Sequence, residues 1–133
     1  MNIAIVGATG NVGRKTLEVF DKKNFKFDNL YLVASEKSAG KKISFRDKEY
    51  VIENLETYDF SKADITFFAA GGKIAEKFAE KAAKHTIVID NSSFFRMDPD
   101  VPLIVPQVNA AEIKNMKKNI IANPNCSTAQ LVI

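Results

Sequence analysis

The only cysteine of the chain, Cys126, stands in the run from Asn123 to Thr128, where a short apolar segment ends and a helical pattern begins. Free N–H groups at a helix N-terminus stabilise a thiolate, which is the nucleophilic form of cysteine. The same groups can stabilise the oxyanion that forms when sulfur attacks a carbonyl. We therefore predict that Cys126 is a catalytic nucleophile. The alternative is a small apolar side chain buried in the core.

A glycine loop near the N-terminus is the second candidate site. The apolar segment 2–6 leads into seven residues with the spacing G-x-x-G-x-x-G, and a helical pattern follows. Glycines permit a tight turn and close approach of the backbone to a ligand, and the following helix points free N–H groups at a pyrophosphate. The spacing differs from the usual G-x-G-x-x-G, so a glycine-rich turn without a ligand is the alternative. The residues expected to bind the pyrophosphate are Gly7, Thr9, Gly10, Asn11, Val12 and Gly13.

The segment after the second expected strand is predicted to decide between NAD and NADP. An NAD-binding domain usually places an acidic residue there for the ribose 2′-hydroxyl. This chain has Ser35, Lys37 and Ser38, whose two hydroxyls and cation suit a 2′-phosphate, so we predict NADP as the cofactor. Glu36 has to point outward for this prediction to hold, and the alternative is a polar surface turn.

Two other segments follow expected strands and therefore fall at the same edge of the sheet. Gly71 and Gly72 either let the backbone approach the dinucleotide or form a plain strand-to-helix turn. Arg96 offers a planar guanidinium that suits a phosphate or a carboxylate. The alternative for Arg96 is a surface salt bridge with Asp98 or Asp100.

Two further patterns are interpreted as having no catalytic role. His85, the only histidine, falls at the end of a helical pattern, where an imidazole suits the helix dipole. Tyr58 and Lys62 have the Tyr-x-x-x-Lys spacing of short-chain dehydrogenases, but they precede a strand in a polar connector instead of lying on a long helix. No metal site is predicted.

Positioning these residues requires alternating strands and helices. Short β-branched runs alternate with amphipathic stretches, which is typical of βαβ units around a parallel sheet. The chain, 1–133, is therefore predicted to be one dinucleotide-binding domain with a Rossmann-like, doubly wound α/β fold and a mostly parallel sheet. The segments 43–45 and 50–52 are expected to form a hairpin at the sheet edge. The expected strands are 2–6, 30–34, 65–69, 86–90 and 119–122, and the expected helices are 11–22, 73–84, 110–117 and one from Cys126 onward. Helix 11–22 is expected to carry Val12, Thr16, Val19 and Phe20 on one side.

Charge and composition exclude several classes of protein. Nineteen basic and sixteen acidic side chains give a net charge of +3, which is too mild to argue for nucleic acid. No apolar stretch approaches the ~20 residues that cross a membrane. A single cysteine forms no internal disulfide, and the cytoplasm is the expected location.

The motifs occur together in an order that resembles the aspartate-semialdehyde dehydrogenases. The resemblance runs from Met1 to Ile133, and the segments Asp90–Arg96 and Asn123–Thr128 are its specific parts. It implies a reversible, NADP- and phosphate-dependent oxidation of aspartate semialdehyde to aspartyl phosphate. In that reaction Cys126 is the nucleophile, Asn125 positions the reacting groups and Arg96 binds phosphate.

The resemblance also implies that this chain is an N-terminal part. The family's acid–base histidine, its substrate-carboxylate arginine and most of its dimer surface belong to a C-terminal catalytic and dimerisation domain, which we expect to be absent here. The longer parent is expected to be a homodimer that binds a small-molecule substrate and phosphate, and the chain alone is expected to have little or no turnover. The alternatives are a non-catalytic NADP-binding module and an enzyme like the related acetylglutamyl-phosphate reductases.

Overall fold

Six strands form one sheet in which every pairing between neighbours is parallel. The computed structural model describes all 133 residues. The strand order is β5-β2-β1-β6-β7-β8, so the chain winds outward from β1 in one direction and then in the other. The strands are β1 (Asn2–Val6), β2 (Asn29–Ala34), β5 (Glu53–Asn54), β6 (Ile65–Phe68), β7 (Ile87–Asp90) and β8 (Ile120–Ala122). This order confirms the predicted doubly wound, Rossmann-like α/β fold.

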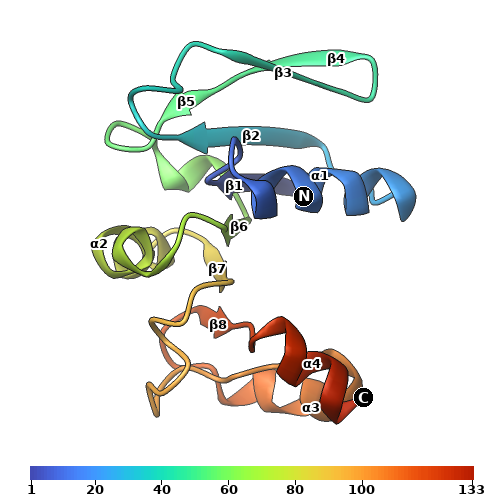
Figure 1. Cartoon of the computed structure of the whole chain (residues 1–133). Coiled ribbons are helices and arrows are strands. Elements are labelled where there is room, and N and C mark those ends of the chain that lie inside the picture. Colours follow the sequence, from blue (N-terminus) through green and yellow to red (C-terminus); the bar gives the residue numbers. More distant parts are fainter.

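The helices cover the two faces of the sheet (Figure 1). Alternate side chains of β1 point to opposite faces. Ile3 and Ile5 pack with α1 (Asn11–Lys22), whereas Ala4 packs in the cluster that includes α2 (Gly72–Ala83). Because both faces of β1 are buried from Ile3 to Val6, these four residues are all apolar. The remaining helical segments are η1 (Phe60–Lys62), α3 (Pro106–Asn109), η2 (Ala110–Asn115) and α4 (Cys126–Val132). None of the helices has both the length and the apolar character that a membrane span requires.

Helix α1 has the predicted bounds, and the side predicted to carry Val12, Thr16, Val19 and Phe20 is confirmed, because these four residues line one cleft. Its buried residues are Gly13, Leu17 and Phe20, whereas Val12 and Val19 are each 44% exposed. Gly13 lies against the loop that precedes the helix, and this contact decides which side of α1 faces the sheet.

The C-terminus of α1 is closed by a Schellman motif. Asn24 has a left-handed conformation (φ 48°), its N–H donates to the Asp21 carbonyl, and the Phe25 N–H donates to the Phe20 carbonyl at 2.8 Å. The rings of Phe20 and Phe25 stack at 4.9 Å between centroids, which supplies the apolar contact of the motif.

The hairpin of β3 (Lys42–Phe45) and β4 (Lys48–Val51) forms a separate two-stranded sheet. The expectation that it continues an edge of the main sheet is wrong, because β5 occupies that edge. Its turn is only Arg46 and Asp47, which both have positive φ (50° and 61°), as a type I′ turn requires.

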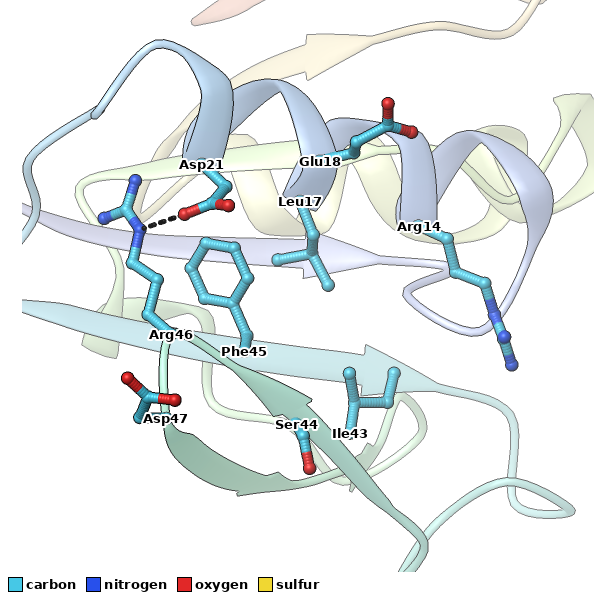
Figure 2. Close-up of a pocket in the computed structure, with 9 residues that line it drawn as sticks. All are labelled: Arg14, Leu17, Glu18, Asp21, Ile43, Ser44, Phe45, Arg46 and Asp47. Carbon is cyan, nitrogen blue, oxygen red and sulfur yellow. Dashed lines mark hydrogen bonds and ion pairs between the residues drawn. The ribbon is translucent and has the colours of Figure 1, made fainter.

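Arg46 anchors this hairpin to α1 (Figure 2). Its guanidinium donates to the carbonyl of Phe20 and, at 2.8 Å, to that of Phe25, and it lies 3.4 Å from an Asp21 carboxylate oxygen. It also packs over the Phe45 ring at 4.9 Å. The backbone strain at Arg46 is therefore offset by contacts that only a long, forked cation makes.

Replacing Arg46 by alanine is expected to lower the free energy of unfolding by about 1.5–3 kcal/mol, the range for hydrogen bonds to charged groups. Urea unfolding followed by circular dichroism measures the loss. The matched variant Asp47→Gly relieves a left-handed backbone without touching α1, so its stability should equal or exceed that of the unmodified chain. Equal stability of Arg46→Ala and the unmodified chain would contradict the anchoring role.

Candidate functional site

The loops that follow β1, β6, β7 and β8 meet at the carboxyl edge of the sheet. Parallel strands end on the same side, and the chain reverses its winding direction between β1 and β6. In open α/β sheets, ligands bind outside the carboxyl ends of the strands at such a switch point. The glycine loop, Gly71–Gly72, Arg96 and Cys126 all lie on these loops.

The glycine loop is held by contacts that exclude larger side chains. Gly7 has φ +85°, and its N–H donates to the Val33 carbonyl at 2.8 Å. A Cβ at Gly7 would lie 2.7 Å from the Ala69 carbonyl oxygen, and a Cβ at Gly13 would lie 2.3 Å from that of Gly7. Both distances are far below van der Waals contact. The glycines are therefore required by the packing itself.

The N-terminus of α1 is open for an anion. Gly10 is the N-cap and gives no side-chain cap, and the first turn contains no acidic residue. Its free N–H groups and the helix dipole therefore favour a negatively charged group at this position.

A cleft of about 770 Å³ extends from the glycine loop over the end of β2. Thr9 and Lys37 both line this cleft. Glu36 also borders the cleft, so the expectation that it points away is not met. Ser38 does not border the cleft, and its N–H donates to the Ser35 carbonyl at 2.9 Å. The lining residues are Val6, Gly7, Thr9, Gly10, Ala34, Ser35, Glu36, Lys37, Asn54, Leu55, Glu56, Ala69, Ala70, Ile74 and Phe78.

The wall formed by Asn54, Leu55 and Glu56 was not found from the sequence. These residues are placed by β5, a strand of only two residues that pairs with Val33 and Ala34. Two residues give no periodicity, so no sequence pattern announces such a strand. Gly71 and Gly72 do not line this cleft; Gly71 has φ +87° and forms the N-cap of α2.

A second cleft, of about 480 Å³, brings the predicted nucleophile and the predicted anion site together. Its lining includes Cys126, Asn125, Arg96 and Val12 of the glycine loop. Cys126 is exposed, so the alternative of a buried apolar cysteine is wrong. Its Sγ lies 3.9 Å from the Asn125 Oδ1 atom.

Asn125 is the N-cap of α4. Its Oδ1 atom accepts the Ser127 N–H at 2.8 Å, and its carbonyl accepts the Ala129 N–H at 2.9 Å. This cap fixes the position of Cys126 at the first residue of the helix.

Arg96 joins the loops that follow β7 and β8. Its Nε donates to the Asn123 carbonyl at 2.9 Å, and its Nη2 donates to the Asn91 carbonyl at 3.2 Å. The alternative of a salt bridge with Asp98 or Asp100 is wrong, because those carboxylates pair with Lys118 and Lys117. Arg96 therefore keeps one guanidinium nitrogen, Nη1, without a protein partner.

Asp90 and Ser92 organise the loop that carries Arg96. The Asp90 side chain is fully buried, and it accepts the Ser92 hydroxyl at 2.6 Å and the Ser92 N–H at 3.0 Å. The sequence signal for this turn is an aspartate at a strand end followed two residues later by a serine. Neither Asp90 nor Ser92 was predicted as a site residue.

The two patterns interpreted as non-catalytic lie away from the clefts. His85 precedes β7, whereas Cys126 follows β8, so they stand at opposite edges of the parallel sheet. The Tyr58 hydroxyl is buried without a hydrogen-bond partner, and burial raises its pKa well above the usual value. Neither residue lines the cleft that contains Cys126.

Comparison with known proteins gives consistent matches. Residues 2–116 match the semialdehyde dehydrogenase NAD-binding domain. Aspartate-semialdehyde dehydrogenase of Aquifex aeolicus is 53% identical over 98% of this chain and 39% of its own length, and that of Rickettsia bellii is 48% identical over 99% and 40%. The chain thus spans about 40% of the length of these curated relatives.

Solved structures give the same pattern. Aspartate semialdehyde dehydrogenase II of Vibrio cholerae, complexed with ASA, superposes with a TM-score of 0.91 at 49% identity, over 98% of this chain and 43% of that one. The Candida albicans enzyme with NADP has a TM-score of 0.70 at 29% identity, over 98% and 44%. A Rex-family repressor, at 17% identity and a TM-score of 0.61, shares the fold alone.

Replacing Gly13 by alanine is expected to destabilise the chain by roughly 2 kcal/mol or more, because overpacking against backbone outweighs the gain in helix propensity of about 1 kcal/mol. Thermal unfolding measures the change. Gly72→Ala is the matched control, since its Cβ would meet only the Phe94 Cβ at 4.0 Å and should cause no loss. A stabilised Gly13→Ala variant would show that the loop and helix are not in close contact.

Proposed function

The chain belongs to the family of the semialdehyde dehydrogenase NAD-binding domain, and on that premise we propose that it is the NADP-binding N-terminal part of an aspartate-semialdehyde dehydrogenase. One observation carries the proposal: a single cleft is lined by the glycine loop through Val12, by Arg96 and by an exposed Cys126. A nucleophile, an anion-binding cation and a cofactor loop therefore share one space.

The residues present fit a dinucleotide. The collisions that a Cβ would cause at Gly7 and Gly13, the uncapped start of α1 and the cleft of about 770 Å³ are the features that a pyrophosphate and an adenosine require. Thr9, Gly10, Asn11 and Val12 would hold the pyrophosphate. Lys37 and Ser35, which both line the cleft, would hold the 2′-phosphate. NADP, when bound, supplies the hydride acceptor.

The proposed chemistry begins at Cys126. Its sulfur, as the thiolate, attacks the aldehyde carbon of aspartate semialdehyde and forms the alkoxide of a thiohemiacetal. The C=O bond then re-forms as hydride leaves that carbon for the acceptor, and a thioester remains. An oxygen of inorganic phosphate then attacks the thioester carbon. The C–S bond breaks, the sulfur leaves as a thiolate, and aspartyl phosphate is released.

Arg96 and Asn125 would support these steps from fixed positions. Arg96 is anchored by two carbonyls and keeps Nη1 for the phosphate. Asn125 caps the helix that carries the nucleophile, so the first-turn N–H groups stay aimed at the position where the oxyanion forms. The longer protein is proposed to be a homodimer with a small-molecule substrate.

We expect iodoacetamide to modify Cys126 faster than a free thiol at neutral pH, because free N–H groups at the start of α4 stabilise the thiolate. NADP should protect the cysteine. Mass spectrometry of the alkylated peptide measures both effects, with Cys126→Ser as the unlabelled control and Asn125→Ala as a variant that should react more slowly. An inert Cys126 in a chain that binds NADP would favour the non-catalytic module instead.

The chain alone is expected to produce NADPH at no more than a background rate from aspartate semialdehyde, phosphate and NADP. General acid–base help worth roughly 10² to 10⁴ in rate is missing, because the only histidine stands at the opposite edge of the sheet. The absorbance of NADPH measures the rate, and Cys126→Ser gives the background. Phosphate-dependent turnover well above that of Cys126→Ser would contradict the expectation.

A further inference from the structure

The charged side chains that line the cleft just after β2 do not by themselves favour a 2′-phosphate. Glu36 and Lys37 both border the cleft, so their charges offset each other. Glu56 borders it too, and its carboxylate pairs with Lys77 at 2.6 Å. A phosphate monoester carries a charge of about −1.5 to −2 at neutral pH. Discrimination in favour of NADP therefore needs a further cation close to these side chains.

Arg14 is a cation that is bonded to the glycine loop. It lies on the exposed side of α1, and its Nε donates to the Thr9 carbonyl at 3.1 Å. Thr9 itself lines the cleft together with Ser35 and Lys37. The guanidinium of Arg14 is therefore bonded to a residue of the cofactor cleft, while Arg14 itself lines the neighbouring cleft between α1 and the β3–β4 hairpin.

The charge of Arg14 is not paired with a carboxylate of the chain. The carboxylate of Glu18 pairs with Lys15 and Lys22, which hold its pKa at about 2, and that of Asp21 pairs with Arg46. Figure 2 shows the Arg14 side chain extending away from both acids, whereas Arg46 is bonded to Asp21. The two Nη groups of Arg14 have no hydrogen-bond partner.

We propose that Arg14 determines cofactor specificity by binding the 2′-phosphate of NADP together with Lys37. This inference rests on the proposed NADP-binding function. The bond from Nε to Thr9 restrains the guanidinium, and a planar fork binds phosphate in a bidentate manner that a lysine does not reproduce. Two cations then outweigh Glu36 at this end of the cleft.

A purely structural role for Arg14 would give a different result. If Arg14 only supported the Thr9 carbonyl, its loss would disturb the pyrophosphate loop, which NAD and NADP share, and both cofactors would bind more weakly. A contact to the 2′-phosphate affects NADP alone. The ratio of the two affinities therefore separates the two roles.

The test is a calorimetric titration of NADP and NAD into the 133-residue chain at low salt. Arg14→Ala should weaken NADP binding about tenfold, which corresponds to 1.4 kcal/mol, and leave NAD binding unchanged. Arg14→Lys should recover part of the loss, because it keeps the charge without the fork. Lys23→Ala is the matched control, since it removes a cation from the far end of the same helix and should leave both affinities unchanged.

The outcomes separate this inference from the proposed function. If the unmodified chain prefers NADP and Arg14→Ala leaves the preference intact, or weakens both cofactors equally, the role of Arg14 is overturned and the proposed function stands. If the unmodified chain shows no preference for NADP, or binds neither cofactor, the assignment of NADP fails and the role of Arg14 fails with it.

Discussion

The contact between Gly13 and the carbonyl of Gly7 is the constraint on which the rest of the structure depends. It brings the first turn of α1 directly against the end of β1, and a single methyl group at Gly13 cannot be accommodated there. The same contact turns Leu17 and Phe20 toward the sheet. Phe20 then receives the Phe25 ring and offers its carbonyl to Arg46, so the hairpin is docked through the helix that the glycines position.

The end of the candidate site that contains Cys126 depends on a different kind of interaction, in which a cation is held by backbone carbonyls. Arg96 connects the loop after β7 to the loop that leads to Cys126. Because these bonds go to main-chain carbonyls, they hold the two loops together independently of the side chains of Asn91 and Asn123. The buried pair of Asp90 and Ser92 sets the first loop, and the Asn125 cap sets the second.

Periodicity predicted most of the fold, and local contacts explain what it missed. Near-continuous apolar runs located β1, β6 and β7, and the glycine loop located the start of α1, because both patterns follow directly from burial and turn geometry. Apolar residues marked one side of α1, but burial of Gly13 against the preceding loop was not predicted because Gly13 carries no apolar side chain. The two-residue strand β5 gives no periodicity, so neither this strand nor the wall at Asn54 was predicted. The site at the carboxyl edge was predictable from the parallel topology. The partners of Arg96 were not, because every residue has a backbone carbonyl and the sequence does not show which of them a side chain will bond.

The central position of β1 also determines the order in which the chain can assemble. Ile3 pairs with Leu30 on one side and with Ile65 on the other, so β1 gains its second neighbour only after β6 has been synthesised. Contacts between residues so far apart in sequence form slowly, because the entropy of closing the loop is lost before the contact is gained, and apolar strands stay exposed in the meantime. Until β6 has been synthesised, the apolar residues Ile3–Val6 lack one of their two neighbouring strands, and the yield in a cell depends on how this segment is shielded.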